Sequence, residues 1–356
     1  MNLEEYFKKL TSGDNLSPWD MIVLAFLKLV SLGYAAAMSL RAAAYSMSLL
    51  RSRSLPKPVV SIGNITVGGT GKTPVTAWVA SYLMARGKKV AVLSRGYGGT
   101  LEGQVAVVSD GESRFLSPEE AGDEPCLLAD ALPGLIVVIG SNRFDAGTLA
   151  MQRFRPDIFI LDDGFQHLKL KRDLNILLLD ARKPLGNGSV FPAGTLREPS
   201  SAIHRADAIV FTRAGTAGLP VELVPDSTPY VGSDHRLAGY RSQSGETRPF
   251  AELQGQRGAA FAGIADPAGF FDSLEKAGLD LAATLSFPDH TGFGESETAA
   301  LAMLRLSSKA DYLITTAKDA VKLGSVAGKE LPFYSAVLEI EFHDEIVIKA
   351  ALDKLL

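Results

Sequence analysis

A strand, a glycine-rich loop and a helix follow one another in the first quarter of the chain, and this arrangement restricts the fold most. Val59–Ile62 is a short apolar, β-branched run, Gly63–Gly71 is the loop, and Pro74 suits the first turn of the helix that follows. Small residues in such a loop allow backbone N–H groups to surround phosphate oxygens. The sequence therefore predicts a P-loop at the end of a buried strand.

Two side chains at the end of this loop have the chemistry that phosphate binding requires. Lys72 would place its ammonium on the β- and γ-phosphates of a nucleoside triphosphate, and Thr73 would offer a hydroxyl to Mg²⁺. The usual pattern has glycine where this chain has Thr66, so Gly68 and Gly69 would supply the turn. The predicted nucleotide-binding residues are Thr66, Gly68, Gly69, Thr70, Gly71, Lys72 and Thr73.

Short β-branched runs then alternate with helical stretches, which predicts a mostly parallel sheet with helices on both faces, as in P-loop NTPases. The expected strands are Val59–Ile62, Val90–Leu93, Leu135–Ile139, Ile158–Leu161, Asn175–Leu179 and Ala208–Phe211, and the expected helices are Val75–Arg86 and Arg143–Phe154.

The second half of the chain predicts a smaller α/β domain. A stretch rich in Gly, Pro and Ser, from about residue 213 to Glu252, suggests a loop and a boundary. The elements expected after it are strands at Gly258–Ala262 and Tyr312–Thr315 and helices at Pro267–Ala277 and Glu295–Leu306. The predicted division is an N-terminal helical segment at 1–57, a P-loop kinase core at 58–213, and at 214–356 a C-terminal domain that closes over the active-site cleft.

The N-terminal segment Met21–Leu50 is mostly apolar, and its longest uncharged stretch, Leu29–Leu40, is shorter than the roughly 20 residues that span a bilayer. Between Met21 and Pro58 there are five basic residues and no acidic ones. Two interpretations stay open: an amphipathic helix in the membrane interface with its basic cluster on anionic headgroups, or a helical hairpin packed on a soluble core.

Composition excludes several classes of protein. The 356 residues are 46% hydrophobic and 21% charged, which argues against wholesale disorder. A net charge of −4 argues against a nucleic-acid partner. Because Cys126 is the only cysteine, the chain has no intramolecular disulfide and no cysteine-rich zinc site, and a reducing compartment is expected.

Candidate acidic partners follow one other predicted strand. Ile158–Leu161 ends in Asp162 and Asp163, which would hold Mg²⁺, although Asp163-Gly164 is also good turn chemistry. Gln166 and His167 lie in the same loop and could reach the phosphates.

Other loops contain candidates for acid–base chemistry. Asp123 could accept the proton of an alcohol acceptor, with Glu124 beside it, but the pair equally suits the first turn of a helix. Arg143 follows a strand, where ligands of open α/β sheets gather, or it is a surface arginine. His290 follows Asp289 in a polar loop, and Thr316–Asp319 is only loosely similar to a base-reading motif.

Taken in order from about residue 58 to 322, eight segments resemble those of tetraacyldisaccharide 4'-kinases, which phosphorylate the lipid A precursor on the cytoplasmic side of the inner membrane of Gram-negative bacteria. They are VSIGNITVGGTGKTP (60–74), LSRGYGG (93–99), GDEP (122–125), Ser141–Arg143, LDDGFQH (161–167), PAGTLR (192–197), Pro288–His290 and TAKDAVK (316–322). Members of that family also lack the first glycine of the P-loop.

The resemblance implies a peripheral membrane enzyme with ATP and Mg²⁺ as cofactors and a membrane glycolipid as its substrate. Asp123 would be the catalytic base and His290 its partner across the domain cleft. Thr73, Asp162 and Asp163 would bind the metal, and the N-terminal helix would contact the membrane. Glu124, Arg143, Gln166 and His167 would line the same site. Thr291 replaces a second histidine common in the family, which puts any role for that position in doubt.

Two rival functions use the same P-loop. A GTPase or metal-insertion ATPase would read its base with Thr316–Asp319 and prefer GTP. A membrane-bound ATPase switch would need no acceptor base, so its ATP turnover would survive Asp123→Ala. Neither rival explains the GDEP and LDDGFQH segments together.

Overall fold

The computed structural model describes residues 3–13, 15–216, 218–289, 291–326 and 331–356. Contacts between residues divide the chain into two compact units. Unit 1 comprises Met1–Arg95, Asn142–Asp234 and Glu341–Leu356, and unit 2 comprises Gly96–Ser141 and His235–Ile340. Each unit is built from stretches that are separate in the sequence. The predicted domains, with boundaries after residues 57 and 213, are instead continuous stretches of sequence. That division stays a prediction.

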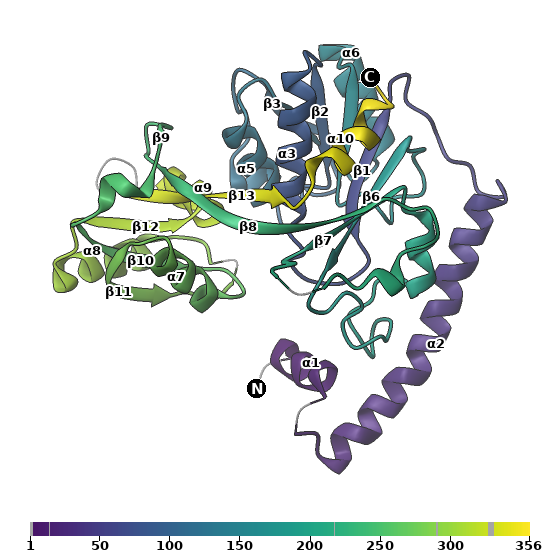
Figure 1. Cartoon of the computed structure of the whole chain (residues 1–356), viewed down its shortest axis with the longest axis horizontal. Helices are drawn as coiled ribbons and strands as arrows, with labels where there is room; N and C mark the ends of the chain where they lie inside the picture. Colours follow the sequence, from purple (N-terminus) through teal and green to yellow (C-terminus); the bar gives the residue numbers. More distant parts are fainter. Residues whose placement is uncertain (1–2, 14, 217, 290, 327–330) are drawn as a thin grey trace. The chain divides into compact units, whose positions relative to one another are not determined.

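Unit 1 contains a parallel sheet with the strand order β8-β7-β6-β1-β5-β2 (Figure 1). Its strands are β1 (Val59–Asn64), β2 (Val90–Ser94), β5 (Ile158–Asp162), β6 (Leu174–Asp180), β7 (Ala208–Thr212) and β8 (Tyr230–Arg241), the last of which continues into unit 2. Every residue of β1, β2, β5 and β7 is buried, as expected for parallel strands that are covered on both faces.

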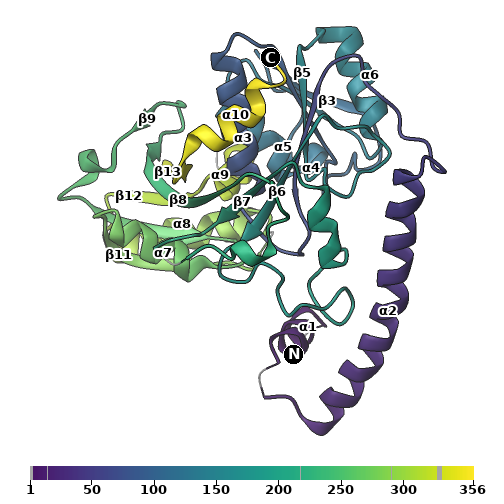
Figure 2. The same ribbon diagram turned by 45° about the vertical axis from the view of Figure 1, so that its right-hand side comes forward.

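Helices cover this sheet. They are α3 (Lys72–Ala85), α6 (Arg143–Phe154) and α10 (Glu345–Asp353), with short 3₁₀ turns at Ser200–Arg205 and Val221–Leu223. Figures 1 and 2 show α3 and α10 side by side, and the Tyr82 hydroxyl donates a hydrogen bond to Asp353 across them (2.6 Å). The chain's last helix therefore packs on the helix that begins at the P-loop.

The N-terminal helices α1 (Leu3–Ser12) and α2 (Pro18–Ser46) belong to unit 1. The Ser17 side chain and Asp20 form a reciprocal capping box that starts α2. In both views α2 is a long helix that extends past the sheet (Figure 2). In the described part of the chain, α2 is the helix whose length and composition would allow it to cross a bilayer, with a mean hydropathy of 2.0 over 18 residues.

Unit 2 contains the parallel run β11-β10-β12-β13 and an antiparallel pair, β3 and β4. Its strands are β3 (Ala106–Asp110), β4 (Ile136–Ile139), β9 (Thr247–Arg248), β10 (Arg257–Ala262), β11 (Asp280–Ser286), β12 (Tyr312–Thr316) and β13 (Phe333–Phe342, which continues into unit 1). Its helices are α4 (Pro118–Ala121), α5 (Asp123–Ala131), α7 (Pro267–Lys276), α8 (Glu295–Ser308) and α9 (Ala317–Val326), with a 3₁₀ turn at Phe250–Leu253.

The predicted fold class is confirmed, and each expected strand and helix is present with boundaries shifted by a few residues. One prediction was wrong. The Gly-, Pro- and Ser-rich stretch up to Glu252 is not all loop, because it includes β8, a strand of 12 residues. Glycine weakens strand propensity, but Gly232 and Gly239 are needed here, since a Cβ would lie 2.7 Å from His343 and 2.3 Å from the Arg248 carbonyl oxygen.

Candidate nucleotide and acceptor sites

The P-loop between β1 and α3 is held in place by a second segment, residues 195–197. The Val67 N–H donates to the carbonyl of Thr195 (2.7 Å), and the Arg197 N–H donates to the carbonyl of Ile65 (2.7 Å). Thr66 lies between these bonds and pairs with Leu196 in an antiparallel bridge. The first half of the loop is therefore extended and pinned.

This pairing explains why Thr66 can stand where P-loops usually have glycine. Left-handed backbone conformations occur at Gly68 (φ 115°) and Gly71 (φ 75°), and Thr66 is not among the residues with positive φ. A β-branched residue suits an extended position. The turn therefore uses Gly68, as predicted, together with Gly71, whereas the predicted Gly69 is not among the residues with positive φ.

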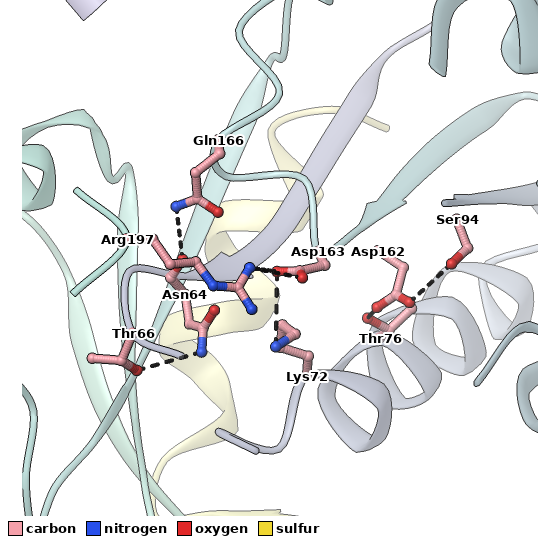
Figure 3. Close-up of polar contacts among 9 residues, drawn as sticks. All are labelled: Asn64, Thr66, Lys72, Thr76, Ser94, Asp162, Asp163, Gln166 and Arg197. Carbon is pink, nitrogen blue, oxygen red and sulfur yellow. Dashed lines mark hydrogen bonds and ion pairs between the residues drawn. The ribbon is translucent and has the colours of Figure 1, made fainter. Parts of the chain in front are cut away.

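The cation of the loop, Lys72, is the first residue of α3 and faces an acidic partner. Its Nζ lies 3.8 Å from Asp163 Oδ1, and Arg197 Nη1 approaches both oxygens of the same carboxylate at 3.1 and 2.9 Å (Figure 3). The side chain of Asp163 is 30% exposed. One accessible carboxylate and two cations therefore gather at the start of the helix that would receive the phosphates.

The neighbouring Asp162 has different surroundings. It ends β5, is 1% exposed, and accepts hydrogen bonds from the hydroxyls of Thr76 (3.1 Å) and Ser94 (3.4 Å) (Figure 3). These hydroxyls come from α3 and β2, so Asp162 joins three elements beneath the P-loop. Asp163 turns the other way because its backbone is left-handed (φ 51°), which Asp tolerates.

Gln166 supports the loop from the same segment. The side-chain N–H of Gln166 donates to the main-chain carbonyl of Asn64 at the end of β1 (2.9 Å). The main-chain carbonyl of Gln166 accepts a hydrogen bond from the Arg41 side chain of α2 (3.1 Å). Gln166 therefore positions the backbone from which the P-loop starts, and the prediction that it reaches the phosphates stays a prediction.

Burial changes the proton affinity of two further predicted residues. Burial, followed by the charge of Arg143, lowers the pKa of His167 to about 4, so its ring is neutral at pH 7. Burial also lowers the pKa of Arg143 to about 10, while Asp162 and Asp163 act in the opposite direction. Arg143 therefore remains a cation at pH 7, and His167 can donate or accept a hydrogen bond only as a neutral ring.

Several atoms of this region suit a triphosphate and Mg²⁺. In the described part of the chain, the buried side-chain oxygens Asn64 Oδ1 and Thr70 Oγ1 make no hydrogen bond. Buried polar atoms normally have partners: a phosphate oxygen would accept from the Thr70 hydroxyl, and a metal-bound water would donate to Asn64 Oδ1. The described residues contain no group of three or more His, Cys, Asp or Glu able to hold a metal. In kinases, Mg²⁺ binds through one or two carboxylates together with substrate phosphates.

The predicted base lies in unit 2. Asp123 is the first residue of α5 and is preceded by Gly122, whose φ is 89°. A Cβ at Gly122 would lie 2.6 Å from the carbonyl oxygen of Tyr97, and one at Gly99 would lie 2.3 Å from that of Glu120. The LSRGYGG and GDEP segments thus interlock through glycine and fix the place of Asp123, whereas Glu124 is exposed.

His290 lies outside the described residues. Of its neighbours, Asp289 pairs with Lys318 (3.4 Å), and Thr291 accepts a hydrogen bond from Lys322 (3.4 Å) through its carbonyl. Asp319 is fully buried and accepts hydrogen bonds from the Thr316 hydroxyl (2.8 Å) and the Gly263 N–H (2.9 Å). Because its side chain is buried, Asp319 is not exposed for contact with a nucleotide base, which the GTPase alternative requires.

Two residues of the candidate nucleotide site are absent from the predicted set. Arg197 pairs with Asp163, and Arg213 donates to the carbonyl of Gly69 (2.7 Å) while it pairs with Asp180. Arg213 directly follows β7, so the rule that selected Arg143, a cation at a strand's carboxyl end, would have found it. No spacing in the sequence indicates that Arg197 pairs with Asp163.

Comparison with known proteins gives one consistent result. Residues 23–356 match the model of the family described as tetraacyldisaccharide-1-P 4'-kinase. The tetraacyldisaccharide 4'-kinase of Geobacter metallireducens is 56% identical, with 95% of this chain and 99% of that protein aligned, and that of Geobacter sulfurreducens is 49% identical over the full length of both. The crystal structure of LpxK from Aquifex aeolicus in complex with ATP is 32% identical, with a TM-score of 0.80, covering 94% of this chain and 99% of that one.

Proposed function

Because this chain belongs to the tetraacyldisaccharide 4'-kinase family, a family of lipid A biosynthesis, we propose that it transfers the γ-phosphate of ATP to the 4'-hydroxyl of a tetraacyldisaccharide 1-phosphate. The reaction takes place at the cytoplasmic face of the bacterial inner membrane. The observation that supports this most is the group formed by Lys72, Asp163 and Arg197 at the start of α3.

In this proposal unit 1 holds the nucleotide. Backbone N–H groups around Gly69–Lys72 bind the phosphate oxygens, and the Lys72 ammonium lies on the β- and γ-phosphates. Thr73 and Asp163 would hold Mg²⁺, which when bound neutralises charge on the phosphates. Arg197 adds a second cation beside Lys72. Arg213 keeps the loop closed by binding the carbonyl of Gly69.

Unit 2 supplies the base. Asp123 orients the 4'-hydroxyl and accepts its proton while the new O–P bond forms and the bond between the γ-phosphorus and the β-phosphate oxygen breaks. ADP and the 4'-phosphorylated lipid are the products. His290 is proposed as the partner of Asp123.

The substrate's acyl chains require that the enzyme work at a lipid surface, since each buried CH₂ contributes about 0.8 kcal/mol to membrane binding. One side of α2 is suited to this contact. Its large apolar side chains are 60% or more exposed at Trp19, Met21, Ile22, Phe26, Leu29, Leu32 and Leu40. An apolar surface of this kind on a soluble protein indicates a binding site.

Contacts on the opposite side of α2 indicate that the helix lies parallel to the membrane surface. Ser31, in its middle, is 6% exposed and bonds to the carbonyl of Val190 (2.7 Å) and the N–H of Ala193 (2.9 Å). Tyr34 bonds to the carbonyl of Arg197 (3.3 Å). The middle of a spanning helix would lie in hydrocarbon, where polar loops like these are not tolerated. We therefore propose peripheral, interfacial binding.

A direct assay tests the proposal. Purified protein is incubated with ATP, Mg²⁺ and tetraacyldisaccharide 1-phosphate in mixed micelles, and the products are separated by charge and mapped by NMR. A bisphosphorylated lipid with its new phosphate at the 4' position is expected, and none should form when that hydroxyl is blocked. ATP hydrolysis that proceeds equally with and without the lipid, with no lipid product, would overturn the proposal and favour an ATPase switch.

A further inference from the structure

We propose that Lys322 is the positioning residue for Asp123, holding one carboxylate oxygen so that the other meets the acceptor hydroxyl. This inference rests on the proposed function, in which Asp123 is the base. The ammonium of Lys322 lies 3.1 Å from Asp123 Oδ2 and 3.4 Å from the carbonyl oxygen of Thr291. Its side chain is 8% exposed, against 17% for Asp123.

The contact joins two helices that pack on each other within unit 2, α5 and α9. Asp123 is the first residue of α5, and Lys322 lies in the second turn of α9. The carbonyl of Thr291 comes from the loop after β11. One buried ammonium therefore connects three separate segments of the chain, one of which contains the proposed base.

The start of α9 is fixed, which makes Lys322 a rigid support. Asp319 accepts hydrogen bonds from the Thr316 hydroxyl (2.8 Å) and from the N–H of Gly263 at the end of β10 (2.9 Å), while the N–H of Asp319 donates back to Thr316 (3.1 Å). Burial raises the pKa of Asp319 above its usual value. The charge of Lys322, three residues later on the same helix face, opposes this rise. Lys322 thus contacts the carboxylate of Asp123, and its charge also acts on Asp319 of the same helix.

A purely structural role is the alternative, and energetics argue against it. Removing an ammonium from water costs several kcal/mol, and apolar residues of similar size often replace buried ion pairs without loss of stability. A lysine used only for packing between α5 and α9 gains little from its charge. A lysine that sets the direction of a reacting carboxylate needs both its charge and its place.

The role in the reaction follows from the two oxygens of Asp123. Lys322 binds Oδ2, and the proton of the 4'-hydroxyl passes to the other oxygen as the bond between the acceptor oxygen and the γ-phosphorus forms. Lys322 keeps its proton throughout. A displacement of about 1 Å in such a group can cost 10²-fold in rate, so the loss expected on removing the ammonium is in kcat.

The test is a double-mutant cycle on the full-length enzyme in the lipid phosphorylation assay. The variants are Lys322→Met, Lys322→Arg, Asp123→Asn and the two double variants, with Lys276→Met, at an exposed lysine of α7, as the matched control. For each, kcat, KM for ATP and for lipid, and the thermal unfolding midpoint are measured. Lys322→Met is expected to lower kcat by about 10- to 100-fold, with KM for ATP within about threefold, and Lys322→Arg to restore much of the loss.

The cycle separates the possible outcomes. In the Asp123→Asn background, Lys322→Met is expected to cost less than threefold, because the group that it positions is gone. Equal losses in both backgrounds, or a folded Lys322→Met enzyme with wild-type kcat, would overturn the inference while the proposed function stands. If Lys322→Met does not fold, Lys322→Gln, which keeps a hydrogen-bond donor at this position but removes the charge, replaces it in the same cycle. Wild-type enzyme that phosphorylates no lipid would instead refute the proposed function.

Discussion

At the end of β5, two adjacent carboxylates have opposite surroundings. Asp162 is buried beneath the P-loop and binds the hydroxyls of Thr76 and Ser94, whereas Asp163 is accessible and faces Lys72 and Arg197. A metal that binds phosphates needs an accessible ligand, so we assign the metal contact to Asp163 and a supporting role to Asp162.

Substitution by asparagine should separate these roles. Asp163→Asn is expected to lower kcat by about 10²–10³-fold, because it removes the anionic ligand proposed for Mg²⁺ at the phosphates, with little change in the thermal midpoint. Asp162→Asn is expected to lower the free energy of unfolding by about 1–3 kcal/mol, because one buried hydroxyl loses its acceptor. Steady-state kinetics and thermal unfolding of both variants test this assignment, and the reverse pattern would exchange the roles.

His167 predicts a pH effect on stability. Its pKa is about 4 in the folded protein and about 6.5 in the unfolded chain. Between these values the unfolded chain binds more protons, so the free energy of unfolding falls as the pH drops from about 6.5 toward 4. The stability difference between the wild type and His167→Gln should therefore be smaller at pH 5 than at pH 7.5, as measured by urea denaturation. A stability difference that does not change with pH would show that His167 has the same pKa in the folded and the unfolded protein.

At the level of elements, the interlocked turns of unit 2 determine where α5 begins. Gly122→Ala would place a Cβ 2.6 Å from the Tyr97 carbonyl at a φ of 89°. We expect a loss of about 1–3 kcal/mol in stability from backbone strain, and a fall in kcat because Asp123 is the next residue. Kinetics and thermal unfolding measure both. Gly33→Ala in α2 is the matched control, since nothing lies within 4 Å of its Cβ and it is expected to be neutral or stabilising.

The apolar side of α2 gives a further prediction. Phe26→Glu and Leu29→Glu change side chains that are 64% and 68% exposed, so the fold should be unaffected. Both should reduce sedimentation with anionic phospholipid vesicles by at least tenfold, because buried apolar surface drives interfacial binding. Met303→Glu, at a similarly exposed position (67%) of α8, is the control. Vesicle binding that is unchanged in the α2 variants would contradict a lipid contact through this side.

The elements that the sequence predicted well are those with a strong local signal. The strand before the P-loop, the helix after it and Asp162 at a strand's end all follow from short patterns. Strand β8 was missed because glycine and serine lower its apparent propensity, while its pairing with β7 comes from tertiary structure. The contacts of Arg197 and Lys322 join segments far apart in the chain, and no single-sequence pattern encodes such a pair.

For the whole molecule, nucleotide binding should stabilise unit 1, which contains every predicted P-loop residue. ATP with Mg²⁺ at 100 times its Kd is expected to add about 2.7 kcal/mol. Differential scanning calorimetry and hydrogen exchange should detect this in the wild type and in Asp123→Ala, and not in Lys72→Ala. Loss of the effect in Asp123→Ala would mean that this residue binds the nucleotide.

In the proposed function, helix α2 does more than attach the protein to the membrane. Tyr34 bonds to the main-chain carbonyl of Arg197 and Arg41 to that of Gln166, two residues of the candidate phosphate site, while Ser31 bonds to the backbone of Val190. In the proposed function, the helix that contacts lipid therefore also supports the backbone around the candidate phosphate site. An unrelated membrane anchor fused in place of α2 is expected to restore lipid binding without these contacts, so kcat should stay below that of the wild type.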